Sequence, residues 1–251
     1  YSKLFKSNIS LILNISPDHL ERHRTISKYV GAKFKLVKNQ SKKDLALLNT
    51  KDYYIKRELK SKKFLPKIKK VRKDINKTLL KKIDNQYFNT VGNSENLKFV
   101  LEVAKVLKLR KNILIKTLKQ FKGLKYRQEI IFQSKKLTII NDSKATTFSS
   151  SVSLLKSLTN VYWIVGGLAK KGDKFLLSKN NCKNFKAYIF GGKKNLFIKA
   201  LKDKVIYESF INLEYSVKKI FLDIKNNKTQ NHHTVLFSPS AASFDSFKNF
   251  E

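Results

Sequence analysis

The stretch KLTIINDSKATT, residues 136–147, indicates the fold most clearly. Its first half, KLTIIN, is an apolar run with the residue types of a β-strand, and its second half is abruptly polar. Further strands are predicted at 161–165, 187–190 and 234–238, with helices near 149–158 and from about 194. Strands that alternate with helices are typical of a parallel sheet covered by helices on both faces, so the predicted fold class is α/β with a mostly parallel sheet.

Polar and glycine residues follow these strands, where ligands of open parallel sheets bind. They are Asn141-Asp142-Ser143-Lys144, Gly166-Gly167, Gly191-Gly192 and Ser238-Pro239-Ser240. Asp142 can accept hydrogen bonds from ribose hydroxyls, Lys144 can meet a phosphate, and the hydroxyls of Ser143 and Thr146 can hold a carboxylate. A turn followed by a helix cap would use the same residue types, so both interpretations stay open.

The segment GGLAKKGDKF, residues 166–175, combines two glycines with two lysines. The glycines allow the backbone to approach a ligand closely, and Lys170 and Lys171 then offer positive charge. The segment is a candidate anion cradle, but it does not match the phosphate-binding pattern G-x-x-x-x-G-K-[ST].

The first half of the chain has a different pattern. The runs 8–14 and 43–49 are predicted strands, and Ser16-Pro17-Asp18 has the residue types of a helix start. The lysine-rich stretch 51–82 shows little periodicity and is predicted to be a solvated, variable region. Helical spacing returns from Asn96, in a helix with Leu97, Val100, Leu101, Ala104 and Leu107, and in a second helix that ends at Gly123, the predicted domain boundary.

Two features of this half are candidates for metal chemistry. His19 and His23 are four residues apart and would share one face of a helix. Spacing alone favours surface histidines on a capped helix over a metal site. Lys33 lies in the apolar stretch YVGAKFKLV, where burial could deprotonate its amine and allow it to capture carbon dioxide as a carbamate. In a chain so rich in lysine, a solvated side chain is the commoner outcome.

Composition excludes several classes of protein. The single cysteine, Cys182, rules out an internal disulfide, no apolar run is long enough for a membrane helix, and the first thirty residues lack a signal-peptide layout. We therefore expect a cytoplasmic protein without a membrane partner.

The formal charge of +36 favours a nucleic-acid partner, but arginine is scarce and lysine is spread along the chain, so we expect no specific nucleic-acid partner. A basic nucleic-acid-binding module is the alternative from another class. The chain has no methionine, and we expect it to be a fragment.

Six motifs in order resemble the Mur ligase family, and within it the ligases that use D-glutamate. They are LNISPDHLERH, GNSEN, GLKYR, INDSKATT, GGLAKKGDKF and SPSAASFDSFKNFE. The resemblance implies part of a central ATP-binding domain in residues 1–122, without its phosphate loop. It also implies a Rossmann-like, amino-acid-binding C-terminal domain in residues 123–251, without its last helix. The fragment alone is expected to be inactive.

The resemblance also implies a reaction. An ADP-forming ligase of this kind uses ATP and Mg²⁺ to join D-glutamate to UDP-N-acetylmuramoyl-L-alanine through an acyl phosphate, in peptidoglycan precursor synthesis. Another Mur or folylpolyglutamate-type ligase with a different amino acid is the near alternative, and NDSKAT argues against it because those relatives resemble one another in carrying a histidine there. We expect a monomer.

The resemblance assigns roles to individual residues. His19 and a carbamylated Lys33 would hold magnesium and act in catalysis. The residues expected to contact the nucleotide are Asn93, Asn96, Arg127, Asp142 and Lys144, although Asn93 could equally cap a helix. The residues expected to contact D-glutamate are Thr146, Lys170, Ser243 and Phe250, with Lys170 chosen over Lys171 by the family's spacing after the double glycine.

Overall fold

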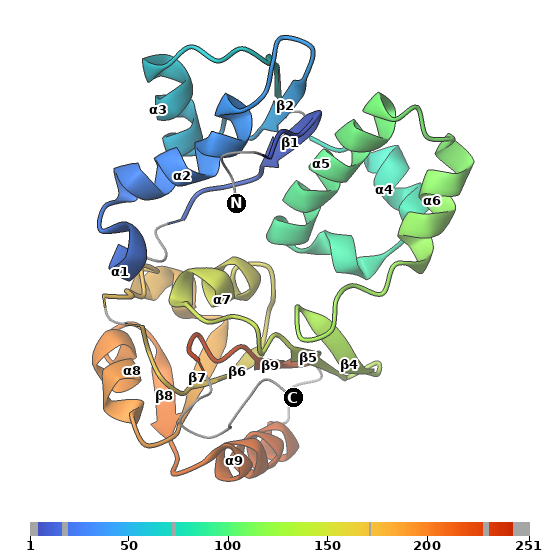
Figure 1. The fold of residues 1–251 in the computed structure, drawn as a ribbon. Coiled ribbons are helices and arrows are strands. Elements are labelled where there is room, and N and C mark those ends of the chain that lie inside the picture. Colours follow the sequence, from blue (N-terminus) through green and yellow to red (C-terminus); the bar gives the residue numbers. More distant parts are fainter. Residues whose placement is uncertain (1–4, 17–19, 72–73, 171, 228–230, 243–251) are drawn as a thin grey trace. The chain divides into compact units, whose positions relative to one another are not determined.

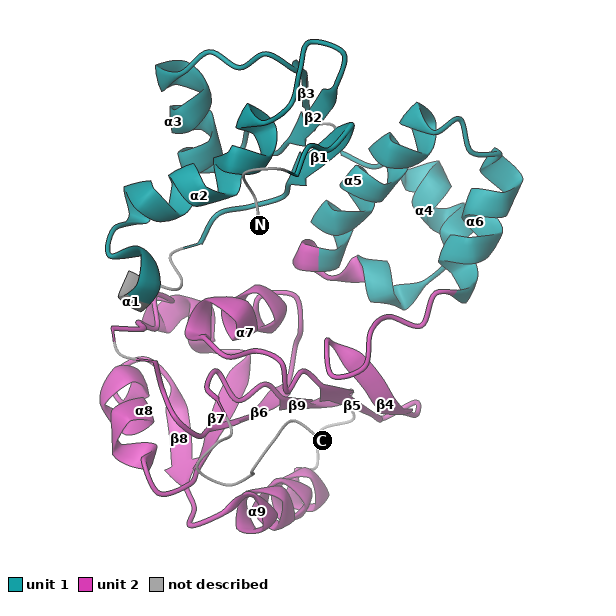
Figure 2. Cartoon of the chain, in the orientation of Figure 1, with its two compact units in different colours: residues 1–88, 93–120 teal, residues 89–92, 121–251 magenta. Residues whose placement is uncertain are grey.

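The computed structural model describes residues 5–16, 20–71, 74–170, 172–227 and 231–242. The chain divides into two compact units, one of residues 1–88 and 93–120 and the other of residues 89–92 and 121–251 (Figure 2). The long segment of the second unit begins at Phe121, close to the predicted boundary at Gly123. No helix in the described ranges has the length and apolar character needed to cross a lipid bilayer.

Unit 1 contains a three-stranded parallel sheet in the order β1-β2-β3, formed by β1 (Ile9–Ile12), β2 (Leu45–Leu48) and β3 (Lys67–Lys70). After β1 comes the short helix α1 (Leu20–His23). The next helices, α2 (Ile26–Lys38) and α3 (Tyr53–Ser61), pack on one face of the sheet through a cluster that includes Phe34, Leu48 and Ile55. The strands predicted within 8–14 and 43–49 are confirmed.

The expectation for residues 51–82 is wrong, because this stretch forms α3, β3 and α4 (Lys77–Ile83). Asp52 and Asn76 cap the two helices by accepting hydrogen bonds from the backbone N–H groups of Ile55 and Thr78. β3 forms the edge of the sheet, where lysine side chains reach solvent while the backbone pairs with β2. The many lysines therefore hid these helices and this strand from the sequence analysis, because helix caps and strand pairing stabilise them.

The remainder of unit 1 is helical. α4, the 3₁₀ helix η1 (Gln86–Asn89), α5 (Val91–Val106) and α6 (Lys111–Gln120) share a cluster of buried residues that includes Ile83, Leu97 and Leu118. α5 begins before the predicted Asn96. Of the residues predicted to line its apolar face, Val100 and Leu107 are exposed, so the buried stripe is narrower than the spacing suggested.

Unit 2 contains a six-stranded sheet in the order β4-β5-β9-β6-β7-β8 (Figure 1). Its strands are β4 (Glu129–Gln133), β5 (Leu137–Asn141), β6 (Val161–Gly166), β7 (Phe185–Phe190), β8 (Ile206–Ser209) and β9 (His233–Phe237). All neighbours are parallel except β4, which is antiparallel to β5. The four predicted strands and the α/β class are confirmed, whereas the edge strands β4 and β8 were missed.

Helices cover both faces of this sheet, as predicted. α7 (Phe148–Leu155) and α8 (Lys194–Leu201) share a core cluster with Trp163, and α9 (Leu213–Asn226) packs against the other face through Ile220, in the cluster of Tyr162. A short 3₁₀ helix, η2 (Lys179–Cys182), precedes β7. Successive side chains of a strand point to opposite faces of the sheet, and helices cover both faces here, so every residue of β6 is buried.

Candidate functional site

The carboxyl ends of β5, β9 and β6 lie next to one another, because these strands are parallel neighbours in the sheet of unit 2. Backbone hydrogen bonds join the segments that follow them. The N–H of Asp142 donates to the carbonyl of Phe237 at 2.7 Å, and the N–H of Gly166 donates to the carbonyl of Pro239 at 3.1 Å. Three of the four polar segments predicted at strand ends, those after β5, β9 and β6, therefore form one continuous edge.

Asp142 is the most perturbed acid of this edge. Only 7% of the residue is exposed, and burial raises the pKa of its carboxyl to about 6. Three features oppose that rise: the hydroxyl of Ser238 donates to Oδ2 at 2.8 Å, the backbone N–H of Gln128 donates to Oδ1 at 3.1 Å, and the Arg127 charge is nearby. The carboxylate is thus held by two donors and titrates near neutrality, as do many groups at functional sites.

The turn after Asp142 carries cationic and hydroxyl side chains. The backbone N–H of Lys144 donates to the carbonyl of Tyr126 at 3.1 Å, which joins the turn to the segment that carries Arg127. The side chains of Arg127 and Lys144 are exposed, and Thr146 is half-buried. The bonded backbone turn agrees with the turn interpretation, and the contacts expected with a ligand stay a prediction.

The glycine-rich segment is fixed by close backbone contacts. A Cβ atom on Gly166 would lie 2.3 Å from the carbonyl oxygen of Phe190, and one on Gly167, whose φ is 110°, would lie 2.6 Å from that of Ala242. Leu168 and Ala242 exchange backbone hydrogen bonds in both directions. Only glycine fits at these two positions. The backbone bonds between Leu168 and Ala242 hold the glycine-rich segment against the segment that follows β9.

Asp173 joins the loop of Lys170 to the turn of Thr146. Its Oδ2 accepts the backbone N–H of Phe148, the first residue of α7, at 2.8 Å, whereas Thr147, the local cap residue, makes no side-chain cap hydrogen bond. Two segments expected to contact the amino acid are thereby linked. Lys170 is half-buried, and Lys171 lies outside the described residues, so the choice between them stays a prediction.

Sequence reasoning missed the contributions of Asp173, Ser238 and Ser151. Ser238 was marked only as a polar residue after a strand, and Asp173 only as part of a loop. Ser151 gave no signal, because a serine inside a helix is ordinarily a solvent-facing residue. Their partners are distant in sequence and become visible only in the fold.

In unit 1, the structure places Lys33 on α2, half-buried instead of enclosed, with its Nζ 5.0 Å from the centre of the Tyr29 ring. The ring of His23 lies 5.2 Å from the same ring. Tyr29 therefore lies between Lys33 and His23, of which only Lys33 is expected to hold magnesium. His19 falls outside the described residues, as do Ser243 and Phe250, and their roles stay predictions.

The two asparagines differ. Asn93 is buried in the first turns of α5, and its Nδ2 donates to the carbonyl of Tyr87 at 2.8 Å, which ties η1 to α5. The helix begins at Val91, so Asn93 is inside it and does not cap it. Asn96 is exposed on the same helix.

The predicted magnesium site is incomplete within the described part of the chain. No group of three or more His, Cys, Asp or Glu side chains gathers there to hold a metal. Magnesium prefers oxygen ligands, and an unmodified lysine amine supplies none. Lys33 would offer an oxygen ligand only as a carbamate, so magnesium stays an expectation.

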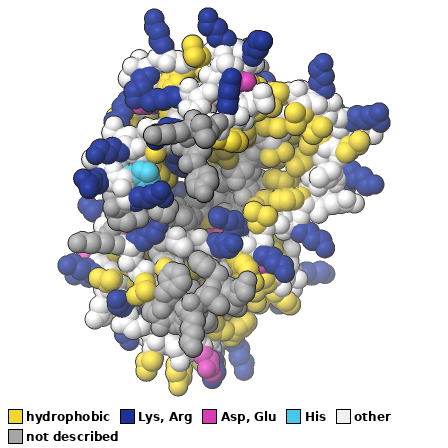
Figure 3. Space-filling view, in the orientation of Figure 1, with side chains coloured by type: hydrophobic (Ala, Val, Ile, Leu, Met, Phe, Trp, Pro, Cys, Tyr) yellow, Lys and Arg dark blue, Asp and Glu magenta, His cyan; other side chains and the backbone are white. Residues whose placement is uncertain are grey.

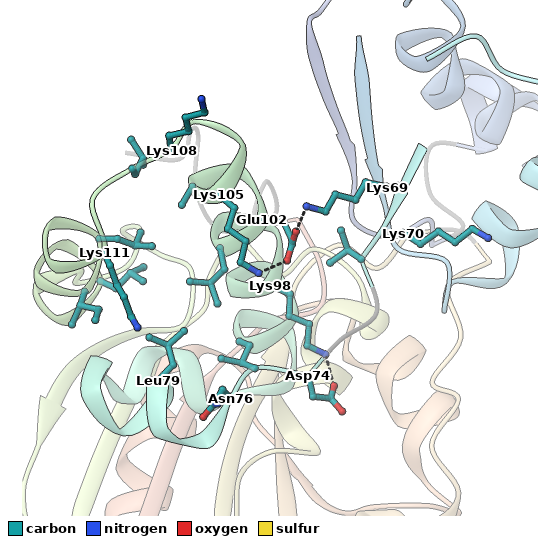
Figure 4. A pocket seen from close by; sticks show the side chains of 18 residues that line it. Lys69, Lys70, Asp74, Asn76, Leu79, Lys98, Glu102, Lys105, Lys108 and Lys111 are labelled. Atoms are coloured by element: carbon teal, nitrogen blue, oxygen red, sulfur yellow. Dashed lines mark hydrogen bonds and ion pairs between the residues drawn. The ribbon is translucent and has the colours of Figure 1, made fainter. Parts of the chain in front are cut away.

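A cavity of about 860 Å³ in unit 1 contains none of the predicted site residues. It opens between β3 and the helices α4, α5 and α6, and lysine and leucine side chains dominate its lining (Figure 4). Both acids of its lining are paired: Glu102 accepts from Lys69 at 2.6 Å and from Lys105 at 2.8 Å. Lys98 likewise donates to Asp74 at 2.9 Å and to Glu95 at 2.6 Å.

Lysine and arginine side chains are scattered over the visible face in Figure 3, with no single basic stripe. This distribution agrees with the spread of lysine along the sequence. A surface dedicated to nucleic acid would concentrate the charge on one face or along one groove.

Comparisons with known proteins agree with the motifs. Residues 1–114 match the Mur ligase middle domain. The UDP-N-acetylmuramoylalanine–D-glutamate ligase of Wolbachia sp. subsp. Brugia malayi is 32% identical over 99% of this chain and 52% of its own length. The protein of the same name from Rickettsia felis is 30% identical over 99% of this chain and 59% of its own length. The chain thus spans between half and three-fifths of these relatives.

Solved structures show the same fold. MurF from Acinetobacter baumannii aligns with a TM-score of 0.66 and 14% identity, covering 98% of this chain and 59% of that one. Folylpolyglutamate synthase from Mycobacterium tuberculosis, solved with ADP and AMPPCP, aligns with a TM-score of 0.63 and 12% identity, covering 95% of this chain and 62% of that one. At such low identity the likeness concerns the fold alone.

Proposed function

The chain belongs to the Mur ligase family, and on that basis we propose that it works as part of an ATP-dependent, ADP-forming ligase that adds D-glutamate to UDP-N-acetylmuramoyl-L-alanine. The observation that carries the proposal is the edge of unit 2, where Asp142, Lys144 and the glycine-rich loop meet at the strand ends. Relatives named for this activity match nearly the whole chain. Since the chain spans about half of them, the activity is proposed for these residues within a ligase of the relatives' length.

In the proposed reaction, a carboxylate oxygen of the acceptor takes the γ-phosphoryl group of ATP, and ADP leaves. The amine of D-glutamate then attacks the carbonyl carbon of this acyl phosphate, an amide bond forms, and inorganic phosphate leaves with the bonding electrons. Magnesium, where bound, neutralises phosphate charge during the transfer. The amine must lose a proton, which the departing phosphate or solvent can accept.

The residues divide between the two ligands. We propose that Arg127 and Lys144 offer positive charge to the nucleotide phosphates and that Asp142 accepts from the ribose, with Asn93 and Asn96 on the adenine side. The residues proposed for D-glutamate are Thr146, Lys170, Ser243 and Phe250, and those proposed for magnesium are His19 and carbamylated Lys33. The link from Asp173 to Phe148 supports the amino-acid group, because it joins the loop of Lys170 to the turn of Thr146.

A ligase for another amino acid is the nearest competing function, because folylpolyglutamate synthase and MurF share this fold. The relatives that match along the chain favour D-glutamate. A nucleic-acid-binding module is the competitor from another class, and the scattered lysines argue against it (Figure 3). It would require affinity that falls steeply with salt and maps to one face.

An ADP-release assay with a panel of amino acids tests the proposal. The ligase that contains this chain is supplied with ATP, Mg²⁺ and UDP-N-acetylmuramoyl-L-alanine, together with D-glutamate, L-glutamate, L-lysine or L-alanine. We expect release only with D-glutamate, and none when the acceptor is omitted. Strict dependence on a different amino acid would overturn the D-glutamate assignment, and release without any acceptor would overturn the ligase assignment.

A further inference from the structure

Four buried polar side chains lie together beneath the strand-end edge of unit 2. Asp142 follows β5, Ser238 and Ser240 follow β9, and Ser151 lies in α7. Asp142 is 7% exposed, Ser240 is 1% exposed, and Ser151 and Ser238 are fully buried. Buried hydroxyl groups require hydrogen-bond partners, and here the four groups supply them to one another.

The hydrogen bonds of this cluster have one consistent direction when Asp142 is ionised. A carboxylate only accepts, so the single hydroxyl proton of Ser238 points to Oδ2 at 2.8 Å. The Ser238 hydroxyl oxygen can then accept the proton of Ser151 at 2.6 Å, while the carbonyl oxygen of Ser238 is a more distant acceptor of the same proton at 3.3 Å. The Ser151 oxygen can accept from Ser240, also at 2.6 Å. Each hydroxyl therefore donates toward the carboxylate.

The surrounding backbone fixes this chain of hydroxyls. The indole Nε1 of Trp163 donates to the carbonyl of Ser238 at 2.8 Å, in the core of the sheet. Ser240 has a φ of 58°, a left-handed conformation that is uncommon for residues other than glycine. Such a conformation persists only where its surroundings enforce it, and here it accompanies the contact between Ser240 and Ser151.

We propose that Ser240, Ser151 and Ser238 form a directed chain of hydroxyl groups that positions the Asp142 carboxylate for the ribose hydroxyls of the nucleotide. The three serines are positioning residues, because they act through Asp142. The ribose part of this inference rests on the proposed function, whereas the hydroxyl chain itself does not. Two lone pairs remain available on the carboxylate after the bonds from Ser238 and Gln128, enough for both hydroxyls of a ribose.

The same chain connects the two expected ligand subsites within unit 2. Ser240 is followed closely by Ala242, which exchanges backbone hydrogen bonds with Leu168 at the start of the loop of Lys170. A shift of the segment after β9 would therefore disturb both the carboxylate of Asp142 and the loop expected to contact the amino acid.

Carbon-detected NMR titration of the Asp142 carboxyl in the 251-residue protein tests the hydroxyl chain without any assay of activity. We expect Ser238→Ala to increase the pKa by about one pH unit, a tenfold decrease in the acid dissociation constant, because a donor to the charged form is lost. Ser151→Ala should increase it by less. Ser216→Ala is the matched control, since Ser216 is also fully buried but donates to the carbonyl of Leu213 in its own helix.

The titration can overturn the proposed hydroxyl chain in two ways. An unchanged or decreased pKa in Ser238→Ala would overturn the directed chain, as would an equal increase in Ser216→Ala. If Ser238→Ala does not fold, Ser151→Ala provides the same test with a smaller expected shift. Ser238→Thr keeps a hydroxyl and should restore the wild-type value.

Steady-state kinetics of the ligase that contains this chain test the ribose role. Ser238→Ala should raise KM for ATP about tenfold while kcat and KM for D-glutamate change less than threefold, and Ser238→Thr should restore KM. An unchanged KM for ATP alongside the NMR shift would overturn the positioning role. A wild-type protein that releases no ADP would instead overturn the proposed function and leave the NMR result intact.

Discussion

The lysine-lined cavity of unit 1 and the Asp142 edge of unit 2 differ in how their polar groups are used. The cavity measures about 860 Å³, yet both of its acids, Glu102 and Asp74, pair with lysines, and the Asp74 side chain remains 84% exposed. The edge has a buried acid, two close backbone approaches at glycines and exposed cations beside them. The candidate site is therefore distinguished from the cavity by a buried acid with a raised pKa beside close backbone contacts, and not by its volume.

The energetics of the two regions differ for the same reason. Ion pairs with an exposed partner contribute little to the free energy of folding, since water already solvates both charges. A buried carboxyl whose pKa is raised lowers the free energy of unfolding when it is charged near neutral pH. Such residues cluster at functional sites. Three predictions test this contrast.

The largest expected effect is on turnover. In the ligase that contains this chain, Lys33→Ala should reduce kcat by at least about 10³-fold, because the proposed carbamate would no longer place magnesium at the phosphates. A small added carboxylic acid should restore part of the activity. The control is Lys105→Ala in the cavity lining, whose partner Glu102 keeps its bond to Lys69, and its kcat should stay within twofold of wild type.

Full activity of Lys33→Ala without rescue would remove the metal role of Lys33. A large loss in Lys105→Ala would reverse the comparison and make the cavity the functional region. ADP release at saturating substrates is the measurement for both variants.

The next effect concerns stability. Gly166→Ala should lower the free energy of unfolding by about 3 kcal/mol or more, because the new Cβ would meet the carbonyl oxygen of Phe190 at 2.3 Å and the backbone would have to shift. Gly31→Ala in α2 is the matched change in unit 1. No heavy atom of the described residues, apart from the chain neighbours and the helix's own nearby backbone, lies within 4 Å of its new Cβ, so the protein should gain about 0.5–1 kcal/mol of stability.

Chemical denaturation followed by circular dichroism measures both variants. A Gly166→Ala protein as stable as wild type would show that the close approach at the strand end is not required.

The smallest effect is the pH dependence of stability. The pKa of Asp142 rises from 3.8 to about 6 on folding, so wild type loses stability as pH increases from about 4 to 6, by at most about 3 kcal/mol. Asp142→Asn removes this titration, and its free energy of unfolding relative to wild type should increase over the same pH range. Lys98 is the contrast in unit 1: burial opposes its charge, but the bonds to Glu95 and Asp74 outweigh burial and raise its pKa.

Lys98→Gln should therefore lose the stability that the charged amine contributes. This loss should be constant with pH wherever Glu95 and Asp74 are ionised, up to about pH 10, where the amine of the unfolded chain titrates. Denaturant unfolding at pH 4, 5, 6 and 7 is the measurement. If the difference in free energy of unfolding between Asp142→Asn and wild type did not change with pH, this result would contradict the raised pKa of Asp142.

Much of unit 2 could be predicted from local pattern. The strands β5, β6, β7 and β9 and the helices α7 and α8 were predicted because long apolar runs are punctuated by glycine and polar residues. β4 and β8 were missed, since edge strands expose their side chains and lack such runs. In unit 1, α3, β3 and α4 were missed because lysine on solvated faces hides the periodicity that a buried face would show.

The sequence by itself determined the α/β class, the Mur ligase resemblance and the position of Asp142 after its strand, because these depend on the order of neighbouring residues. Only the tertiary structure decided that Ser151 and Ser238 meet beneath Asp142 and that Asp173 holds the start of α7. Those contacts join residues far apart in the chain. Their distances depend on how strands pair and helices pack, which no local pattern of side chains specifies.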